Sequence, residues 1–509
     1  MSQAKGPLLK RTGTGIAESK WPRYPTVYEI NTAVWLSDLA AQAGRPIDLR
    51  SVPAGEWDAI AKFGFDAVWL MGVWERSPAG IAIANANDGL LAEFRRALPD
   101  FRTEDNLGSP YCVRQYLVDR QLGGPDGLAA ARRELAQRGM RLILDFVPNH
   151  VAPDHPWVVE HPEYFIRGTA DDVRKDPSSF VEFGGTVFAR GRDPFFPAWP
   201  DVLQLNAFHP GLRRAAIETI ASLAGQCDGI RCDMAMLFLN HVFARTWGSR
   251  AGPQPATEYW ADAIAAVRKA RPDFRFIAEA YWDLEWALQQ LGFDFCYDKR
   301  LYDRLEHDSA ESVRLHLCAE LPYQEKLIRF IENHDEPRAA QTFPPGKLQA
   351  AAITIATLPG ARLFYEGQFE GRKVRAPVFL RRRPNEPQDP ALRVFYGKLL
   401  GAIDAAAFRE GQWSLCRRWG WTDNPTYQNL VAWSWLKGDD RYLIVVNLSG
   451  RSAQARVQPP WGDLRGKTWR LVDVLRDVTY DRSGDEIGGD GLYVDLGAWG
   501  CHFFRMHST

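Results

Sequence analysis

The chain has 509 residues, of which 46% are hydrophobic and 25% are charged, the balance of an ordinary globular protein. At roughly 150 residues per domain, this length predicts about three domains. The formal net charge is −1, so the chain as a whole has no electrostatic attraction for nucleic acid. No apolar run approaches the roughly 20 residues that span a bilayer. We therefore expect a globular protein whose partners include neither nucleic acid nor a membrane.

The cysteines and the N-terminus suggest a reducing compartment. The seven cysteines are scattered, and no two of them form a CxxC pair, which predicts free thiols rather than a disulfide framework. The opening MSQAKGPLLKRTGTGIAESK has no apolar core of the secretory kind. Its RTGTG stretch lacks the Lys-Ser or Lys-Thr of a phosphate-binding loop. Residues 1–24 are interpreted as a tail, and the expected location is the cytoplasm.

Strand-like and helix-like segments alternate from about residue 25 to residue 406. Helical periodicity occurs over 124–139, 209–226, 256–270 and 346–360. Strands alternating with helices favour a (β/α)8 TIM barrel, because no early glycine-rich turn marks the nucleotide crevice of an open sheet. The eight β-rich runs are Val27–Ile30, Ala67–Leu70, Arg141–Val147, Gly229–Arg231, Phe274–Ala278, Phe293–Cys296, Leu327–Ile331 and Arg362–Tyr365.

Two regions depart from this alternation. Residues 152–208 are rich in Pro, Asp, Phe and Trp and show no clear helix, which predicts an irregular inserted domain after strand 3. Short alternating runs from residue 409 to residue 509 predict an antiparallel β-sandwich domain. The catalytic barrel would then comprise residues 25–151 and 209–408. The Arg381–Arg383 triplet is interpreted as part of a solvated loop.

Charged and polar residues directly follow four of the predicted strands. They are Asp145, Asn149 and His150 after strand 3, Arg231 and Asp233 at strand 4, Glu279 after strand 5, and His334, Asp335 and Arg338 after strand 7. Catalytic residues of TIM barrels project from the C-terminal ends of strands, so these four groups predict one shared site. An isolated aspartate could instead cap a helix, and His150 alone could be structural. The four groups together are hard to explain in that way.

A zinc site is the alternative that these residues also raise. His150, Asp154, His155 and His161 are suitable zinc ligands by type. They lie in an irregular, proline-rich stretch without an HExxH-like helix to fix their spacing. Catalytic zinc is therefore disfavoured.

The four segments resemble the conserved regions of the α-amylase superfamily, glycoside hydrolase family 13. DFVPNH resembles the first region, GIRCD the second, the glutamate of FIAEAYW the third, and ENHD the fourth. DVLQLN (201–206) is similar to an additional motif of the family near the end of its inserted domain. LPGARLFYEGQFEG (358–371) resembles the last barrel strand and its loop. The resemblance spans about residues 25–400, with the motifs in the family's order.

The resemblance implies roles for individual residues. Asp233 matches the nucleophile, Glu279 the general acid/base, and Asp335 the carboxylate that stabilises the transition state. Asn149 matches an asparagine that binds a structural calcium ion in many of these amylases. No cofactor is required, calcium is possible, and a tightly held ion is not expected. The residues that match the subsite of the cleaved sugar are Asp145, His150, Arg231, His334 and Tyr111.

The implied reaction is retaining cleavage of an α-glucoside. Arg231 precedes Asp233 by two residues, so both side chains of a strand point the same way, and its charge is expected to keep Asp233 ionised. Glu279 needs a raised pKa, which burial and a neighbouring carboxylate can supply. Trp282 and Trp286 are candidate sugar platforms. Hydrolysis of short α-glucans is the first hypothesis, glycosyl transfer to a sugar acceptor the second, and a non-catalytic glucan-binding protein the third.

One departure from the family pattern concerns the leaving-group side. Many α-amylases carry Lys and His three and four positions after the nucleophile, where this chain has Met236 and Leu237. An apolar pair cannot hydrogen-bond to sugar hydroxyls, although the run may simply begin a buried helix. We therefore expect weak internal cleavage of starch and better action on short α-glucosides.

Overall fold

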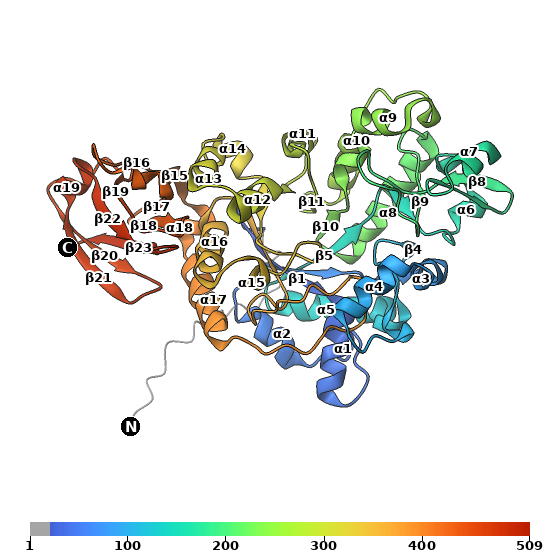
Figure 1. The fold of residues 1–509 in the computed structure, drawn as a ribbon, viewed down its shortest axis with the longest axis horizontal. Helices are drawn as coiled ribbons and strands as arrows, with labels where there is room; N and C mark the ends of the chain where they lie inside the picture. The colour runs from blue at the N-terminus through green and yellow to red at the C-terminus, as the bar shows by residue number, and fades with distance from the viewer. Residues whose placement is uncertain (1–20) are drawn as a thin grey trace.

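The computed structural model describes residues 21–509, so most of the tail interpreted over residues 1–24 lies outside the described residues. Figure 1 shows an elongated molecule with the barrel at its centre. Across residues 21–509, no helix has both the length and the apolar character needed to cross a membrane. All seven cysteines are free.

Eight parallel strands form a closed barrel. β1 pairs with both β2 and β14, which closes the sheet. Each strand coincides with one of the β-rich runs predicted from the sequence, so the TIM-barrel prediction is confirmed. In barrel order the strands are β1 (Thr26–Asn31), β2 (Ala67–Met71), β5 (Arg141–Phe146), β10 (Gly229–Cys232), β11 (Arg275–Ala278), β12 (Phe295–Tyr297), β13 (Leu327–Arg329) and β14 (Ala361–Tyr365).

Helices surround the barrel where the apolar periodicity predicted them. The four predicted helices are α5 (Gly124–Gln137), α8 (Pro210–Gln226), α10 (Tyr259–Ala270) and α16 (Pro345–Thr357). α8 begins at Pro210 because proline suits the first helical turn and the preceding His209 side chain accepts a hydrogen bond from Leu212 N. Further helices that bear on the sites below are α1 (Thr32–Ala43), α2 (Ala54–Ala61), α11 (Glu285–Gln290), α12 (Lys299–His307) and α17 (Pro390–Ile403).

A long excursion after β2 was not predicted from the sequence. It contains β3 (Trp74–Arg76), α3 (Pro78–Asn85), α4 (Asp88–Ala97) and β4 (Val113–Val118). β3 pairs with β4 in an antiparallel ribbon whose register shifts twice. A three-residue strand with an irregular register has too short an alternation to be recognised from the sequence.

The inserted segment after β5 is less irregular than expected. β6 (His150–Val151) pairs with β9 (Leu203–Gln204), which ties the two ends of the segment together. Between them lie α6 (Trp157–Glu160), α7 (Ala170–Lys175) and the hairpin of β7 (Phe180–Phe183) and β8 (Thr186–Ala189). The expectation of no clear helix is wrong at α6 and α7. A capping box formed by Thr169 and Asp172 stabilises α7. Figure 1 shows the segment on the right of the barrel.

The C-terminal strands form two antiparallel sheets. The larger sheet has the order β15-β17-β18-β23-β20-β21 and the smaller has the order β16-β19-β22. One hydrophobic cluster lies between them and contains residues of both, including Leu443, Val457 and Val494, as expected for a sandwich. Their bounds are β15 (Gln412–Leu415), β16 (Arg417–Trp419), β17 (Leu430–Lys437), β18 (Asp440–Asn447), β19 (Ala453–Gln458), β20 (Thr468–Asp473), β21 (Val478–Ser483), β22 (Leu492–Leu496) and β23 (Cys501–Ser508).

The larger C-terminal sheet also packs against the barrel. Trp433 and Trp435 of β17 belong to the core cluster of the barrel, and their indole nitrogens donate to Oγ1 and to the carbonyl of Thr357, at 3.2 and 2.6 Å. The barrel and this sheet therefore share one continuous apolar core, at the opposite end of the molecule from the inserted segment (Figure 1).

Candidate active site

Arg231 brings together carboxylates from three barrel strands. Its side chain is 1% exposed. One guanidinium nitrogen, Nη1, lies 2.7 Å from Asp233 Oδ1 and 3.8 Å from Asp145 Oδ1. The other, Nη2, lies 2.8 Å from Glu279 Oε2. The ends of β5, β10 and β11 thus place all four of these sequence-predicted residues in a single ion-pair network.

Asp145 is held in place by hydrogen bonds from outside this network. Its Oδ2 accepts hydrogen bonds from Trp69 Nε1 and from Gly72 N, both at 3.2 Å. Burial raises the pKa of Asp145 to about 6, although the charge of Arg231 opposes this shift. The guanidinium of Arg231 also lies 5.3 Å from the ring centre of Trp69 and 5.2 Å from that of Tyr111, within cation–π range.

The two carboxyls proposed for catalysis are both buried. Burial raises the pKa of Glu279 to about 7, helped by the charge of Asp233 and opposed by Arg231. Tyr281 Oη donates to Glu279 Oε1 at 2.8 Å, and the Met234 amide donates to Oε2 at 2.6 Å. Burial also raises the pKa of Asp233, and the opposing effect of Arg231 does not cancel it. The sequence argument thus gave the effect of Arg231 its correct sign but overlooked burial.

Unusual backbone conformations follow both of these carboxyls. Met234, directly after Asp233, has φ +41°, and Trp282 and Asp283 have φ +63° and +62°. Non-glycine residues adopt this left-handed region at a cost of about 1 kcal/mol or more each, and such residues cluster at functional sites. The sharp turns place Met234 and Trp282 in the wall of the cavity beside Glu279.

A second buried chain of charges runs through His334. Its Nδ1 pairs with Glu29 of β1, and its Nε2 lies 2.9 Å from Asp335 Oδ2 and 2.7 Å from Tyr111 Oη. Burial works against the charged imidazole, but Asp335 and Glu29 outweigh it and hold the pKa of His334 well above its usual value. The same pairing lowers the pKa of Asp335 to about 2, against the opposing effect of desolvation. The Asp335 side chain remains 44% exposed, so it can still reach a ligand.

His150 and Asn149 lie where the inserted segment leaves the barrel. His150 is buried, and desolvation lowers its pKa to about 3, so the imidazole is neutral near pH 7. Asn149 exchanges hydrogen bonds with Gln204 of β9. Gln204 Nε2 donates to the carbonyl and to Oδ1 of Asn149, at 3.0 and 2.9 Å, and Asn149 Nδ2 donates to Gln204 Oε1 at 3.2 Å.

These contacts do not fit Asn149 as a calcium ligand. Calcium takes 6–8 oxygen ligands, but both oxygens of Asn149 already accept hydrogen bonds from Gln204. Within residues 21–509, no cluster of three or more His, Cys, Asp or Glu side chains is suited to hold a metal ion. The absence of a tightly held ion stays a prediction.

The candidate zinc ligands are occupied separately. Asp154 accepts a hydrogen bond from Ser77 Oγ at 2.6 Å. His155 Nδ1 accepts one from the Trp157 amide, and His161 Nδ1 lies 3.1 Å from Glu163. These side chains serve local structure and do not converge on a common point.

A cavity of about 420 Å³ opens beside Glu279. Its walls include Met234, Tyr281, Trp282, Lys299 and Glu336. Trp282 is therefore in the position expected of a sugar platform, with its ring edge-to-face against Phe195, 4.8 Å away. Trp286 is not part of this lining and is instead 50% exposed on α11.

The apolar pair that follows Asp233, Met236 and Leu237, is not part of the lining of this cavity. Met236 and Leu237 are 0% and 3% exposed within a short 3₁₀ turn. Polar groups reach the cavity from other elements, because Lys299 begins α12 and Glu336 follows β13. The alternative that this run is simply buried is confirmed, while the expected weak cleavage of starch stays a prediction.

The sequence argument missed three residues of the site. Glu29 lies in the apolar run TVYEIN and is fully buried, so a lone carboxylate inside a strand was an available signal. Trp69 had no such signal, and Gln204 lies in the motif DVLQLN noted above, which did not predict its contact with Asn149. The roles of both residues depend on partners that are distant in sequence.

Several α-amylases are among the solved structures that resemble this chain. A noncanonic maltogenic α-amylase, AmyB from Thermotoga neapolitana, aligns with a TM-score of 0.68 and 18% identity, covering 96% of this chain and 99% of that one. An α-amylase from Lactobacillus plantarum aligns with a TM-score of 0.65 and 18% identity, covering 95% of this chain and 99% of that one. At this identity the likeness establishes the fold alone.

Similar sequences belong to both hydrolases and transferases. Alpha-amylase MalA from Haloarcula japonica is 26% identical over 388 residues, which are 72% of this chain and 48% of that protein. Alpha-1,4-glucan:maltose-1-phosphate maltosyltransferase from Bifidobacterium longum is 27% identical over 284 residues, 52% of this chain and 32% of that protein. The chain thus spans half or less of the length of these relatives. The family described as "Alpha amylase, catalytic domain" matches residues 54–389. This chain belongs to the α-amylase family.

Proposed function

We propose that the protein cleaves α-glucosidic bonds of short α-glucans with retention of configuration, through a covalent glycosyl-enzyme. Asp233 is the nucleophile, Glu279 the general acid and then the general base, and Asp335 the group that stabilises the transition state. The observation that carries this proposal is the single guanidinium of Arg231, which contacts both Asp233 and Glu279. A bridge by one guanidinium supports a short separation of the two carboxyls, and retaining enzymes hold theirs about 5 Å apart, whereas inverting enzymes hold them ~6.5–9.5 Å apart.

The protonation of the site supports the same assignment. A general acid must hold its proton near the working pH, and burial raises the pKa of Glu279 to about 7. Asp335, with a pKa of about 2, remains a carboxylate that can stabilise positive charge on the sugar ring. Of these two residues, Glu279 is protonated in part at neutral pH and Asp335 is fully ionised.

Transfer to a sugar acceptor is the second candidate. Maltosyltransferases are among the similar sequences, and the 420 Å³ cavity beside Glu279 has room for an acceptor. Its lining favours a neutral sugar over a phosphate. Lys299 pairs with Asp303 and Glu336, and Arg300 donates to Asp283 at 2.6 Å, so neither cation is free for a phosphate group. A glucan-binding protein without activity is disfavoured by the intact set of three carboxyls.

Product analysis by NMR tests these alternatives. The protein is incubated with maltose, maltotriose, sucrose, soluble starch and maltose 1-phosphate, and early spectra are recorded. We expect the α-anomer to form first, with short α-glucosides cleaved faster than starch. An initial β-anomer would refute retention. Maltotriose formed from maltose together with one glucose per transfer, or an isomeric disaccharide formed without net release of glucose, would favour transfer. Random internal cuts in starch would restore an ordinary endo-acting amylase.

A further inference from the structure

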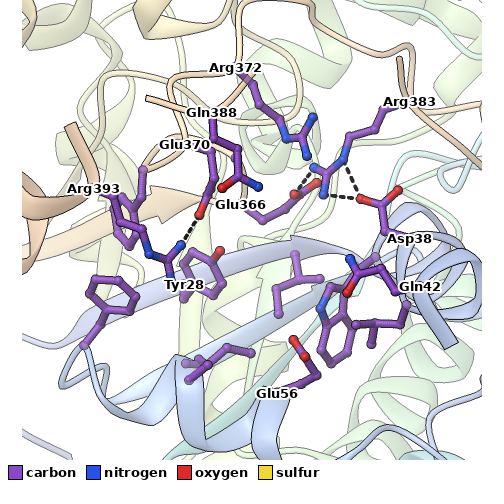
Figure 2. A pocket seen from close by; sticks show the side chains of 18 of the residues that line it. Tyr28, Asp38, Gln42, Glu56, Glu366, Glu370, Arg372, Arg383, Gln388 and Arg393 are labelled. Carbon is purple, nitrogen blue, oxygen red and sulfur yellow. Dashed lines mark hydrogen bonds and ion pairs between the residues drawn. The ribbon is translucent and has the colours of Figure 1, made fainter. Parts of the chain in front are cut away.

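A second cavity, of about 230 Å³, lies outside the barrel wall. It is enclosed by β1, by helices α1 and α2, and by the loop between β14 and α17 (Figure 2). Tyr28 of β1 points into this cavity, whereas its neighbour Glu29 points into the barrel and pairs with His334. Successive side chains of a strand face opposite ways, so the barrel wall separates this cavity from the active site.

The floor of the cavity is aromatic. The ring of Tyr28 stacks on Phe65 with centroids 4.7 Å apart and an angle of 22° between the rings. Phe369 lies 6.0 Å from Tyr28, at 25°. The ring of Phe63 packs 4.9 Å from that of Phe369. The rings of Tyr28, Phe65 and Phe369 are nearly parallel, whereas that of Phe63 is tilted by 47° to that of Phe369. Aromatic rings have a partly negative face, which suits the C–H groups of a pyranose ring.

Ion pairs hold the opposite wall in place. Arg383 donates to Asp38 at 2.8 Å and also pairs with Glu366, while Arg393 pairs with Glu370 (Figure 2). The Arg383 side chain is only 10% exposed. The sequence interpretation of a solvated triplet is therefore wrong at Arg383, because two acidic partners from distant segments bury its charge. These pairs leave the wall rigid and largely neutralised.

Other polar groups of the cavity have no such partner. The Nε of Arg372 is buried and without a hydrogen-bond partner, and its guanidinium is repelled by Arg383 while Glu366 attracts it. Across residues 21–509, no hydrogen bond joins the side chain of Gln388 or Glu56, or the hydroxyl of Tyr28, to another protein group. Figure 2 shows Arg372 and Gln388 on one side of the opening, Glu56 on the other, and Tyr28 between them.

We propose that this cavity is a second carbohydrate site, which binds one neutral mono- or disaccharide. Its volume lies below the roughly 300–1,000 Å³ of sites for drug-sized ligands, which limits the ligand to a small molecule. Among the charged side chains that line the cavity, only Arg372 and Glu56 form no ion pair with a residue of the described chain. A ligand that carries hydroxyl groups can donate to Glu56 and accept from Arg372, whereas a phosphate would satisfy Arg372 only. The choice of a sugar rests on the proposed function.

Binding stoichiometry tests this proposal. Full-length Asp233→Asn protein, which cannot turn over substrate, is titrated calorimetrically with maltose, with glucose and separately with inorganic phosphate. We expect two sugar-binding events and no phosphate binding. Adding Arg372→Leu should weaken one event about tenfold or more, the loss expected for hydrogen bonds to a charged donor. Adding Tyr28→Phe, which keeps the aromatic floor, should weaken the same event about threefold.

Arg381→Leu is the matched control, because this exposed arginine of the same loop does not line the cavity. It should leave both events unchanged. Without Asp233→Asn, the Arg372→Leu protein should cleave an aryl α-glucoside as fast as the parent. Two unaltered events in the Arg372→Leu protein, or phosphate binding that Arg372→Leu abolishes, would refute the proposal. If the unaltered protein cleaves α-glucosides but the Asp233→Asn protein shows only one sugar-binding event, the second carbohydrate site is refuted and the proposed function is not. A parent that neither cleaves α-glucosides nor binds sugar would refute the proposed function as well.

Discussion

The two sides of Glu279 are built in different ways. On one side, Arg231, Asp145 and Asp233 lie on barrel strands, are almost fully buried and fix one another by ion pairs. On the other side, the 420 Å³ cavity is lined by residues of loops and helix starts, among them Trp282 and Lys299. The comparison indicates that the barrel strands set the reaction, while the loops set which partner molecule is accepted.

The largest expected effect is a loss of kcat caused by a change on the strand side of Glu279. Asp233→Asn removes the proposed nucleophile and should lower kcat by at least about a thousandfold. Asp303→Asn, on the cavity side, serves as its matched control and should change kcat by less than about threefold, since its exposed contact with Lys299 contributes little. Both are measured with an aryl α-glucoside. An Asp233→Asn protein that keeps a tenth of the parent kcat would contradict the assignment.

Glu279→Ala tests the proposed general acid with two substrates whose leaving groups differ in their need for a proton. Loss of a general acid costs about 10²–10⁴-fold in rate, but only where the leaving oxygen needs a proton. We expect this loss with maltose and a much smaller loss with a nitrophenyl α-glucoside in the first, glycosylation step. Pre-steady-state release of nitrophenol measures that step. Equal losses with both substrates would mean that Glu279 does not protonate the leaving group.

The pH dependence of kcat/KM should follow the ionisation of Glu279. Glu279 must be protonated to act as an acid and has a pKa of about 7, so kcat/KM should fall as the pH rises through about 7. Tyr281→Phe removes a hydrogen bond to the ionised form, which raises the pKa of Glu279 and should move this limb to higher pH. If kcat/KM of Tyr281→Phe fell over the same pH range as that of the parent, Tyr281 would have no effect on the pKa of Glu279.

Glu29→Gln tests the buried support on the strand side. Without the charge of Glu29, the pKa of His334 should fall and Asp335 should lose part of its counter-charge. We expect kcat to drop about tenfold, consistent with about 1.4 kcal/mol of lost charge stabilisation, and KM to change little. His334→Gln is the comparison variant. If Glu29→Gln raised KM alone, Glu29 would serve ligand binding rather than the charge of His334.

The smallest effects concern the link between barrel and inserted segment. Gln204→Leu leaves the buried Oδ1 of Asn149 without its donor, whereas the carbonyl of Asn149 keeps the Leu205 amide. We expect the free energy of unfolding to fall by about 1–3 kcal/mol. Gln137→Leu, at an exposed position of α5, should change it by less than about 0.5 kcal/mol. Thermal unfolding measures both. A chelator should leave Tm unchanged, and a calcium-reversible fall of many degrees would show that a metal ion is held after all.

The order of apolar and charged residues was sufficient to predict the barrel and the strand-end residues, among them Asp233, Glu279 and Asp335. These signals are local, since they require only the order of apolar and charged residues along a few positions. The roles proposed for these three carboxyls came from the resemblance to the α-amylase superfamily. The short α7 and the ribbon of β3 and β4 were missed because a capping box or a shifted register leaves little periodicity to detect.

Only the tertiary structure decided which side chains support and surround those carboxyls. Glu29 meets His334 across 305 positions of the chain, and Asn149 meets Gln204 across 55. No pattern within a window of sequence encodes such pairs, because they form only when the sheet closes and brings distant strands side by side. The same holds for both cavities, whose walls combine loops from separate segments. Periodicity fixes where a strand begins and ends, whereas the contacts between strands depend on how the whole barrel packs.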